Sequence, residues 1–145
     1  MPTRKANATW QGGLQKGTGT FKGQTGLGGQ YNFSSRFENG TGSNPEELLA
    51  AAHAACFSMA LAVGLEQGGF TPTKVETDAA CTVEKVGAGF KITRMQLTTR
   101  ATVPNLDDAK FQAIASATRN PRPQESRRLR FRGRETRPRS LAGPV

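Results

Sequence analysis

The amino-acid sequence predicts an α+β domain, in which short strand-like segments are followed by a long apolar helix, two longer strand-like segments and a second helix. Three observations support this prediction. Glycine-rich turns divide residues 5–37 into short extended segments, a capped apolar run begins at residue 44, and apolar and polar residues alternate after Pro72. The expected arrangement is N-terminal strands plus an antiparallel sheet around a long buried central helix.

Three short strands are predicted in the first part of the chain, at residues 5–10, 17–21 and 31–37. Gly12 and Gly13 follow the first of them, and the glycines of residues 26–29 precede the third. Glycine favours tight turns and the connections are short, so neighbouring strands are expected to pair as a meander.

The long helix is predicted to begin after Asn44 and to end at Gly68 and Gly69. Asn44 is a good N-cap, Pro45 suits the first helical position, and Glu47 lies three residues after the cap. Apolar residues occur nearly all the way round the helix: Leu48, Leu49, Ala52, Cys56, Met59, Ala60 and Val63. A helix with this pattern is expected to be buried on more than one side.

The alternating segments after Pro72 predict a hairpin. Residues 75–83 place apolar side chains at every second position, which indicates a half-buried strand with Cys81 on its inward face. A turn at residues 87–89 leads to a second strand at residues 90–103, with a change of phase near Thr93 and Arg94. Asn105 is expected to cap a second helix at residues 106–117.

The composition indicates one modest hydrophobic core and no cofactor or metal. Hydrophobic residues make up 35% of the 145 residues, a content that dimerisation would help to stabilise. No stretch approaches the roughly 18 uninterrupted apolar residues of a membrane helix and residues 1–20 are not signal-like, so a cytoplasmic protein without a membrane partner is expected. Two cysteines and one histidine argue against a disulfide scaffold or a zinc site, and residues 23–28 lack a phosphate-binding loop.

The positive charge is concentrated at the C-terminal end. Residues 119–145 contain nine arginines and two glutamates, which is +7 of the net +9, and half of the eight prolines. Such a composition predicts a disordered or loosely docked segment. We therefore predict a domain at residues 1–118 and an atypical Arg/Pro-rich tail at residues 119–145. Because out-of-frame reading of a G/C-rich gene yields such segments, a frameshift near Thr118 is one hypothesis for its origin.

Several segments of this domain resemble the OsmC signature of the OsmC/Ohr superfamily. They are residues 44–61 (Asn-Pro-Glu-Glu-Leu-Leu-Ala-Ala-Ala-His-Ala-Ala-Cys-Phe-Ser-Met-Ala-Leu), 10–12 (Trp-Gln-Gly), 33–38 (Phe-Ser-Ser-Arg-Phe-Glu), 69–73 (Gly-Phe-Thr-Pro-Thr) and 103–107 (Val-Pro-Asn-Leu-Asp). The resemblance covers roughly residues 5–118. It implies the OsmC-like fold and an intertwined homodimer with active sites at the subunit interface. It also implies a thiol-dependent peroxidase of oxidative and osmotic stress defence, which reduces organic hydroperoxides and, less efficiently, hydrogen peroxide.

By motif position, the resemblance assigns catalytic roles to Cys56, Arg36 and Glu46. Cys56 would attack the peroxide, assisted by Arg36 on the predicted third strand and by Glu46 in Asn-Pro-Glu. Because apolar surroundings disfavour a thiolate, a cation such as Arg36 would stabilise the thiolate and the leaving alkoxide, and Glu46 would hold the guanidinium in a bidentate pair. Ten residues, or roughly 15 Å of helix, separate Glu46 from Cys56, so Arg36 or a partner subunit must bridge them.

The family's second, resolving cysteine has no counterpart at the expected position, where residues 119–123 are Arg-Asn-Pro-Arg-Pro. A sulfenic acid on Cys56 would then need an external dithiol for recycling, for which the resemblance suggests a lipoyl-type molecule, and turnover would be impaired. Cys81 does not match the resolving position and is interpreted as a buried strand residue.

Other interpretations of the same residues stay open. Cys56 also fits an ordinary core position, Arg36 an exposed strand charge, and Glu46 a first-turn carboxylate favoured by the helix dipole. His53 lies three residues before Cys56, but a packed neutral histidine is the simpler interpretation and it is left out of the catalytic set. The arginine-rich tail suggests a nucleic-acid-binding protein, although Phe131 alone is available for base stacking in it. A structural homodimer without peroxidase activity is the third alternative.

Overall fold

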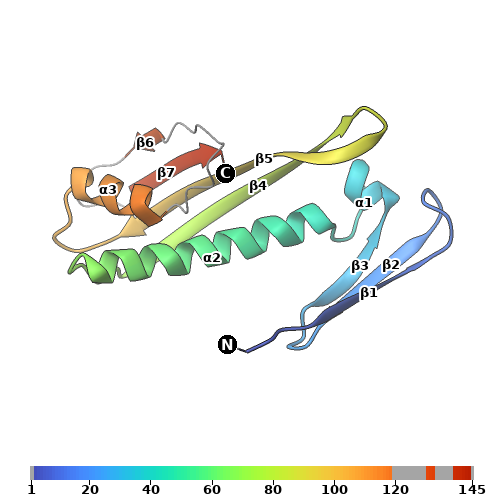
Figure 1. Cartoon of the computed structure of the whole chain (residues 1–145), viewed down its shortest axis with the longest axis horizontal. Helices are drawn as coiled ribbons and strands as arrows, with labels where there is room; N and C mark the ends of the chain where they lie inside the picture. Colours follow the sequence, from blue (N-terminus) through green and yellow to red (C-terminus); the bar gives the residue numbers. More distant parts are fainter. Residues whose placement is uncertain (1, 119–129, 133–138, 145) are drawn as a thin grey trace. The chain divides into compact units, whose positions relative to one another are not determined.

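The computed structural model describes residues 2–118, 130–132 and 139–144 (Figure 1). The chain divides into two compact units, Met1–Leu48 and Leu49–Val145. The first unit contains an antiparallel three-stranded sheet and a short helix, and the second contains an antiparallel four-stranded sheet with helices. The α+β class with antiparallel sheets, predicted from the sequence, is confirmed.

The sheet of the first unit is a meander of three strands. They are β1 (Ala6–Gln11), β2 (Thr18–Gly23) and β3 (Gly28–Asn32), paired in this order. Trp10, Gly19 and Tyr31 are cross-strand neighbours, and the Trp10 and Tyr31 rings lie 5.4 Å apart. A side chain at position 19 would overlap the Tyr31 ring, so a glycine at this position allows both rings to cover the sheet. The predicted meander is confirmed.

The third strand ends earlier than predicted, because a helical turn replaces residues 33–37. Helix α1 (Phe33–Phe37) begins at Asn32, whose side-chain oxygen accepts a hydrogen bond from the Ser35 backbone N–H at 2.8 Å. The Ser35 hydroxyl in turn accepts from the Asn32 backbone N–H at 3.0 Å. This reciprocal capping box satisfies two backbone donors and starts a helix within the segment at residues 31–37 that was predicted to be a strand. Arg36 therefore lies on α1, and its predicted place on a strand is wrong.

The predicted long helix is present as α2 (Pro45–Gln67), which begins in the first unit and continues in the second. Asn44 caps it, because its side-chain oxygen accepts a hydrogen bond from the Glu47 backbone N–H at 2.8 Å. The helix ends before Gly69, which has a φ of +85°. The Phe70 N–H donates to the Leu65 carbonyl at 2.9 Å, as in helices that a left-handed glycine terminates.

The predicted hairpin is formed by β4 (Lys74–Val86) and β5 (Gly89–Thr102) in the second unit. Thr82 pairs with Arg94 and Val83 pairs with Ile92, so Thr93 is the extra residue of a β-bulge. This bulge confirms the change of phase predicted from the sequence. Cys81 is half-buried on the inward-facing positions of β4, as predicted.

The second predicted helix is α3 (Asp108–Thr118), but its cap differs from the prediction. Asp107 caps α3, since its carboxylate accepts a hydrogen bond from the Lys110 backbone N–H at 2.9 Å. Asn105 instead has a φ of 57°, in the left-handed region that asparagine tolerates better than most residues. The chain therefore turns at Asn105 and starts the helix later than predicted.

Two short strands, β6 (Arg130–Arg132) and β7 (Arg139–Pro144), lie in the segment that was predicted to be disordered or loosely docked. β7 pairs with β5, and the sheet order is β4–β5–β7–β6. Such pairing does not require a particular side-chain pattern, because a free strand edge offers backbone N–H and C=O groups to any extended segment. Residues 119–129 and 133–138, and the predicted properties of the tail there, lie outside the described residues.

The core of the second unit lies between α2, α3 and the sheet. It contains the buried side chains of Leu61, Leu65, Ala101, Leu106, Phe111 and Ala115. The side of α2 that carries Cys56 is exposed, with Met59 at 73% and Val63 at 52% of their full exposure. Burial of α2 on more than one side, as predicted, is therefore wrong within the single chain. Only one side of the helix faces the sheet and α3, and the apolar residues elsewhere on it need another surface to cover them.

By length and composition, α2 could also cross a membrane, which the sequence analysis did not expect. It has 23 residues, and its most apolar 18-residue window has a mean hydropathy of 1.9. A single helix of this kind is weak evidence, because the central helix of a soluble protein has the same length and composition. Leu61 and Leu65 of α2 lie in the core of the second unit, and 17% of that apolar window is buried within the described chain.

A chain of hydroxyl groups attaches α2 to the sheet. The Ser58 hydroxyl donates to Thr77 Oγ1 at 2.7 Å, and Thr77 Oγ1 lies 3.0 Å from Thr99 Oγ1. Thr77 and Thr99 are directly opposite each other on β4 and β5, and Thr99 is fully buried. Because hydrogen bonds are directional, this contact fixes the rotation of α2 about its own axis. The orientation of Cys56, two residues before Ser58, is set by the same contact.

Ser58→Ala is expected to lower the free energy of unfolding by about 1 kcal/mol relative to Ser116→Ala, because it removes one hydrogen bond of the chain of hydroxyls. Ser116 is an exposed residue of α3, so its substitution corrects for the higher helix propensity of alanine. Denaturant unfolding followed by circular dichroism measures the difference. Equal free energies for the two variants would show that the contact does not stabilise the protein.

Candidate active site

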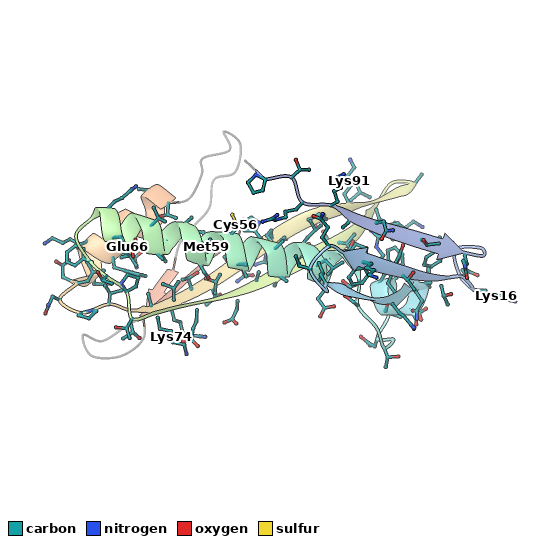
Figure 2. The ribbon with its side chains drawn as sticks, turned by 90° about the horizontal axis from the view of Figure 1, so that it is seen from below. Lys16, Cys56, Met59, Glu66, Lys74 and Lys91 are labelled. Carbon is teal, nitrogen blue, oxygen red and sulfur yellow. The ribbon has the colours of Figure 1, made fainter. Side chains whose placement is uncertain are left out.

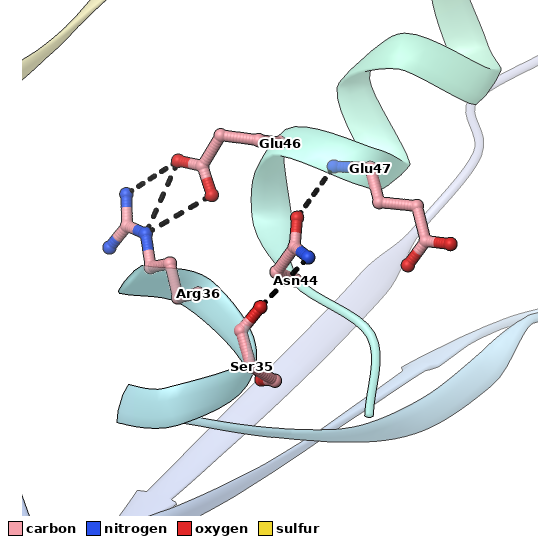
Figure 3. Close-up of polar contacts among 5 residues, drawn as sticks. All are labelled: Ser35, Arg36, Asn44, Glu46 and Glu47. Atoms are coloured by element: carbon pink, nitrogen blue, oxygen red, sulfur yellow. Dashed lines mark hydrogen bonds and ion pairs between the residues drawn. The ribbon is translucent and has the colours of Figure 1, made fainter. Parts of the chain in front are cut away.

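Arg36 and Glu46, two of the three predicted catalytic residues, form an ion pair in the first unit (Figure 3). Arg36 Nη2 donates to Glu46 Oε1 at 2.8 Å, and Arg36 Nε lies 3.2 Å from both carboxylate oxygens. A carboxylate that accepts hydrogen bonds from both nitrogens of one guanidinium edge makes a charge-assisted pair with a defined orientation. The bidentate contact predicted from the sequence is confirmed.

The local fold brings the two side chains together through Asn44 and Ser35. Asn44 Nδ2 donates to the Ser35 carbonyl at 3.0 Å while its oxygen caps α2 (Figure 3). The Ser35 hydroxyl also contacts the Ser43 carbonyl at 2.9 Å. These contacts close the loop between α1 and the first turn of α2. They place α1, which carries Arg36, next to the turn of α2 that carries Glu46.

The two partners differ in exposure. The side chain of Glu46 is 8% exposed and that of Arg36 is 36% exposed. A carboxylate this buried is stable only with a partner, and it also lies in the first turn of α2, where the helix dipole favours negative charge. Among the described residues, Arg36 Nη1 makes no hydrogen bond, so the outer edge of the guanidinium keeps donors for an anionic ligand.

Arg36 has one further contact, which was not predicted from the sequence. The guanidinium carbon lies 5.0 Å from the centre of the Phe37 ring, within the range of cation–π attraction. Phe37 in turn lies 5.1 Å from Phe33, ring centre to ring centre. Adjacent residues on a strand point to opposite faces, so the predicted strand gave no reason to pair Arg36 with Phe37.

Cys56, the third predicted residue, is exposed on α2 in the second unit (Figure 2). It shares one helix face with Leu49, Met59 and Val63, which are also exposed. The expectation that the thiol is held away from water is not met within the single chain. The Arg36–Glu46 pair lies in the first unit, so it is the part of the predicted trio that the structure assembles.

Cys81 lies too far along the sheet to form a disulfide with Cys56 in this arrangement. Ser58 of α2 contacts Thr77 of β4, so this contact serves as a common reference point on the two elements. Cys56 lies two residues, or about 3 Å, from it towards the start of α2, and Cys81 lies four residues, or about 13 Å, from it along β4. The remaining offset of about 10 Å exceeds the Cα separation of roughly 7 Å that a disulfide allows. This geometry agrees with the interpretation of Cys81 as a strand residue.

Among the described residues, no group of three or more histidine, cysteine, aspartate or glutamate side chains is placed to hold a metal ion. The chemistry that the described residues offer is that of a cysteine, a held arginine and a buried carboxylate.

The chain belongs to the OsmC-like protein family, whose profile matches residues 38–120. A curated relative, peroxiredoxin OsmC of Escherichia coli (strain K12), is 46% identical over 113 residues, which span 77% of this chain and 79% of that protein. The organic hydroperoxide resistance protein of Xanthomonas axonopodis pv. citri (strain 306) is 36% identical over 76 residues, about half of each chain. The match to these relatives confirms the resemblance to the OsmC/Ohr superfamily.

Solved structures of this superfamily share the fold. The crystal structure of the organic hydroperoxide resistance protein OhrB of Bacillus subtilis superimposes with a TM-score of 0.56 at 26% identity, covering 79% of this chain and 82% of that one. An OsmC-like protein of unknown function from Vibrio cholerae O1 biovar eltor str. N16961 superimposes with a TM-score of 0.61 at 12% identity, covering 81% and 88%. The OsmC-like fold predicted from the sequence is thus confirmed.

Glu46→Gln is expected to lower the free energy of unfolding by about 1–3 kcal/mol, because it leaves the Arg36 charge without its anionic partner while the side-chain volume is kept. Glu47→Gln is the matched control, since Glu47 is exposed and contacts the Ser43 hydroxyl. It should change stability by less than about 0.5 kcal/mol. Chemical denaturation of both variants tests this, and equal losses would show that the ion pair contributes nothing specific.

Proposed function

We propose that this protein is a cysteine-based peroxidase that reduces organic hydroperoxides, with Cys56 as nucleophile and Arg36 and Glu46 as assisting residues. The bidentate Arg36–Glu46 pair carries this proposal, because it supplies a permanent cation held by a buried carboxylate at the motif positions. The names of the relatives, peroxiredoxin and organic hydroperoxide resistance protein, support the same activity. We place it in oxidative and osmotic stress defence in the cytoplasm.

In the proposed reaction, the Cys56 thiolate attacks the terminal oxygen of a hydroperoxide, ROOH. The sulfur–oxygen bond forms as the O–O bond breaks, so that Cys56 is oxidised to a sulfenic acid and the peroxide is reduced by two electrons. The other oxygen leaves as an alkoxide, which takes up a proton and becomes the alcohol ROH. Arg36 would donate to this leaving oxygen as its charge develops, and Glu46 would hold the guanidinium in place.

The active form in this proposal is a homodimer with its active sites at the subunit interface. The exposed face of α2 supports it, because Leu49, Met59 and Val63 form an apolar surface around Cys56. A second copy that packs on this face would bury the apolar side chains and remove the thiol from bulk water. The partner subunit could then contribute the Arg36–Glu46 pair that Cys56 needs.

An external dithiol, of the lipoyl type, is the proposed reductant. Residues 82–145 contain no cysteine, and Cys81 is offset from Cys56 by about 10 Å along the sheet, more than a disulfide allows. One thiol of the reductant would attack the sulfenic acid, releasing water and forming a mixed disulfide. Its second thiol would then release the Cys56 thiol as the reductant closes to a cyclic disulfide. Turnover is expected to depend on the concentration of this dithiol.

Addition of one equivalent of cumene hydroperoxide is expected to convert Cys56 to a sulfenic acid that a dimedone-type trap captures, as seen in the intact mass of the protein. Cys56→Ser should give no adduct, whereas Cys81→Ser should behave as the parent chain. With a lipoyl-type dithiol as reductant, the parent chain and Cys81→Ser should consume peroxide, whereas Cys56→Ser should not. Folded parent protein without an adduct would overturn the proposed function, and an adduct in Cys56→Ser would assign the nucleophile to Cys81.

Met59→Glu is expected to weaken the proposed dimer at least about tenfold in dissociation constant, because it places a charge on the apolar face of α2. Leu27→Glu is the control, since Leu27 is also an exposed apolar side chain, 56% exposed, but belongs to the first unit and not to the apolar face of α2. Sedimentation velocity over a concentration series measures both. A dimer unchanged by Met59→Glu would exclude this face as the interface.

A further inference from the structure

The aromatic contact of Arg36 is part of a short row of side chains on α1. Phe33 and Phe37 are four residues apart on this helix, with ring centres 5.1 Å apart and planes tilted by 47°. The Arg36 guanidinium lies over the Phe37 ring, its central carbon 5.0 Å from the ring centre. Phe33 therefore supports Phe37, and Phe37 supports the guanidinium.

The ion pair with Glu46 restrains the guanidinium along one edge only. Hydrogen bonds from Nε and Nη2 to the carboxylate fix the distance and the direction of that edge (Figure 3). They resist tilting of the guanidinium plane weakly, because hydrogen-bond energy changes slowly for small departures from linearity. The Phe37 ring, with the guanidinium carbon 5.0 Å from its centre, opposes such a tilt, since the attraction depends on the cation lying over the ring face.

We propose that Phe37 is a positioning residue for Arg36, and that it holds the guanidinium plane so that Nη1 points in a fixed direction. This proposal deepens the proposed function and rests on it, because Nη1 would be the donor to the leaving peroxide oxygen. Nη1 makes no hydrogen bond to any described residue, and Arg36 keeps 36% of its side-chain exposure. A donor must lie about 2.7–3.1 Å from the developing charge, so a tilt of the plane weakens its effect.

A purely structural role for Phe37 makes a different prediction. The ring is half-buried on α1, so its removal would also leave a gap in the first unit. A loss of stability alone therefore does not distinguish the two roles. The two roles differ in two respects. If Phe37 positions Arg36, its substitution affects the rate only while the Arg36 charge is present, and another aromatic ring at position 37 restores the parental behaviour.

The first test measures Arg36 directly and does not depend on activity. In ¹⁵N-labelled protein, hydrogen exchange of the Arg36 Nε–H is compared in the parent chain, Phe37→Leu, Phe37→Tyr and Phe21→Leu. Phe37→Leu should accelerate the exchange several-fold, because the guanidinium leaves its hydrogen bonds more often. Phe37→Tyr should restore the parental rate, and Phe21→Leu, on the sheet of the same unit, should not change it. An unchanged exchange rate in Phe37→Leu would overturn the proposal.

The second test is a kinetic cycle with cumene hydroperoxide. Phe37→Leu should lower kcat/KM roughly three- to tenfold, and Phe37→Tyr should recover most of it. In an Arg36→Gln background, which removes the charge, Phe37→Leu should have no further effect. An equal loss in both backgrounds would assign Phe37 a structural role and overturn the proposal.

The two proposals fail in different ways. A parent chain that forms no Cys56 sulfenic acid contradicts the proposed function, and the exchange measurement still decides whether Phe37 positions Arg36. If Phe37→Leu does not fold, Phe33→Leu replaces it, because the Phe33 and Phe37 rings are in contact, with their centres 5.1 Å apart. Phe33→Leu should also accelerate the hydrogen exchange of the Arg36 Nε–H, by a smaller factor than is expected for Phe37→Leu. A parental exchange rate in Phe33→Leu would overturn the proposal.

Discussion

The start of helix α2 is the constraint on which the candidate site depends. Asn44 caps this helix with its side-chain oxygen and, with its side-chain nitrogen, holds the carbonyl of Ser35 on α1. The same turn of α2 buries Glu46, and a buried carboxylate at this position requires a cation. Arg36 is one residue after Ser35, so the cap brings that cation to the carboxylate. One asparagine thus couples the beginning of a helix to the assembly of an ion pair.

Much of the fold was predictable because its signals are local. Glycine turns, the Asn44 cap and the two-residue alternation act within a few residues, and the meander, α2 and the hairpin with its bulge at Thr93 follow from them. The errors occur where two local signals compete or where pairing is not local. At residues 33–37 the glycine turns before the segment predicted a strand, but the capping box of Asn32 and Ser35 starts a helix. The pairing of β7 with β5 depends on a free backbone edge, which no side-chain pattern records.

The candidate site likewise contains one contact that the sequence predicted and one that it did not. The Arg36–Glu46 contact was predictable, because both residues occupy positions of the resembling signature and a guanidinium and a carboxylate form a bidentate pair. The Phe37 contact was not, because its prediction needed the correct secondary structure for α1: neighbours separate on a strand but lie about 100° apart around a helix. An error in one short element therefore concealed the residue that lies against the guanidinium.

The exposed face of α2 connects stability with the proposed chemistry. Apolar area left in water costs about 25 cal/mol for each Å², and Met59 and Val63 both remain more than half exposed in the single chain. A thiol on the same face would form a sulfenic acid that water-borne oxidants reach, and further oxidation of that acid is irreversible. A second copy on this face would both bury the apolar side chains and restrict the access of oxidants to Cys56.

Because Cys81 lies too far along β4 to form a disulfide, the sulfenic acid would persist until a reductant entered that interface. Under the proposed function, the shape of the interface, rather than a second cysteine of this chain, selects the reductant.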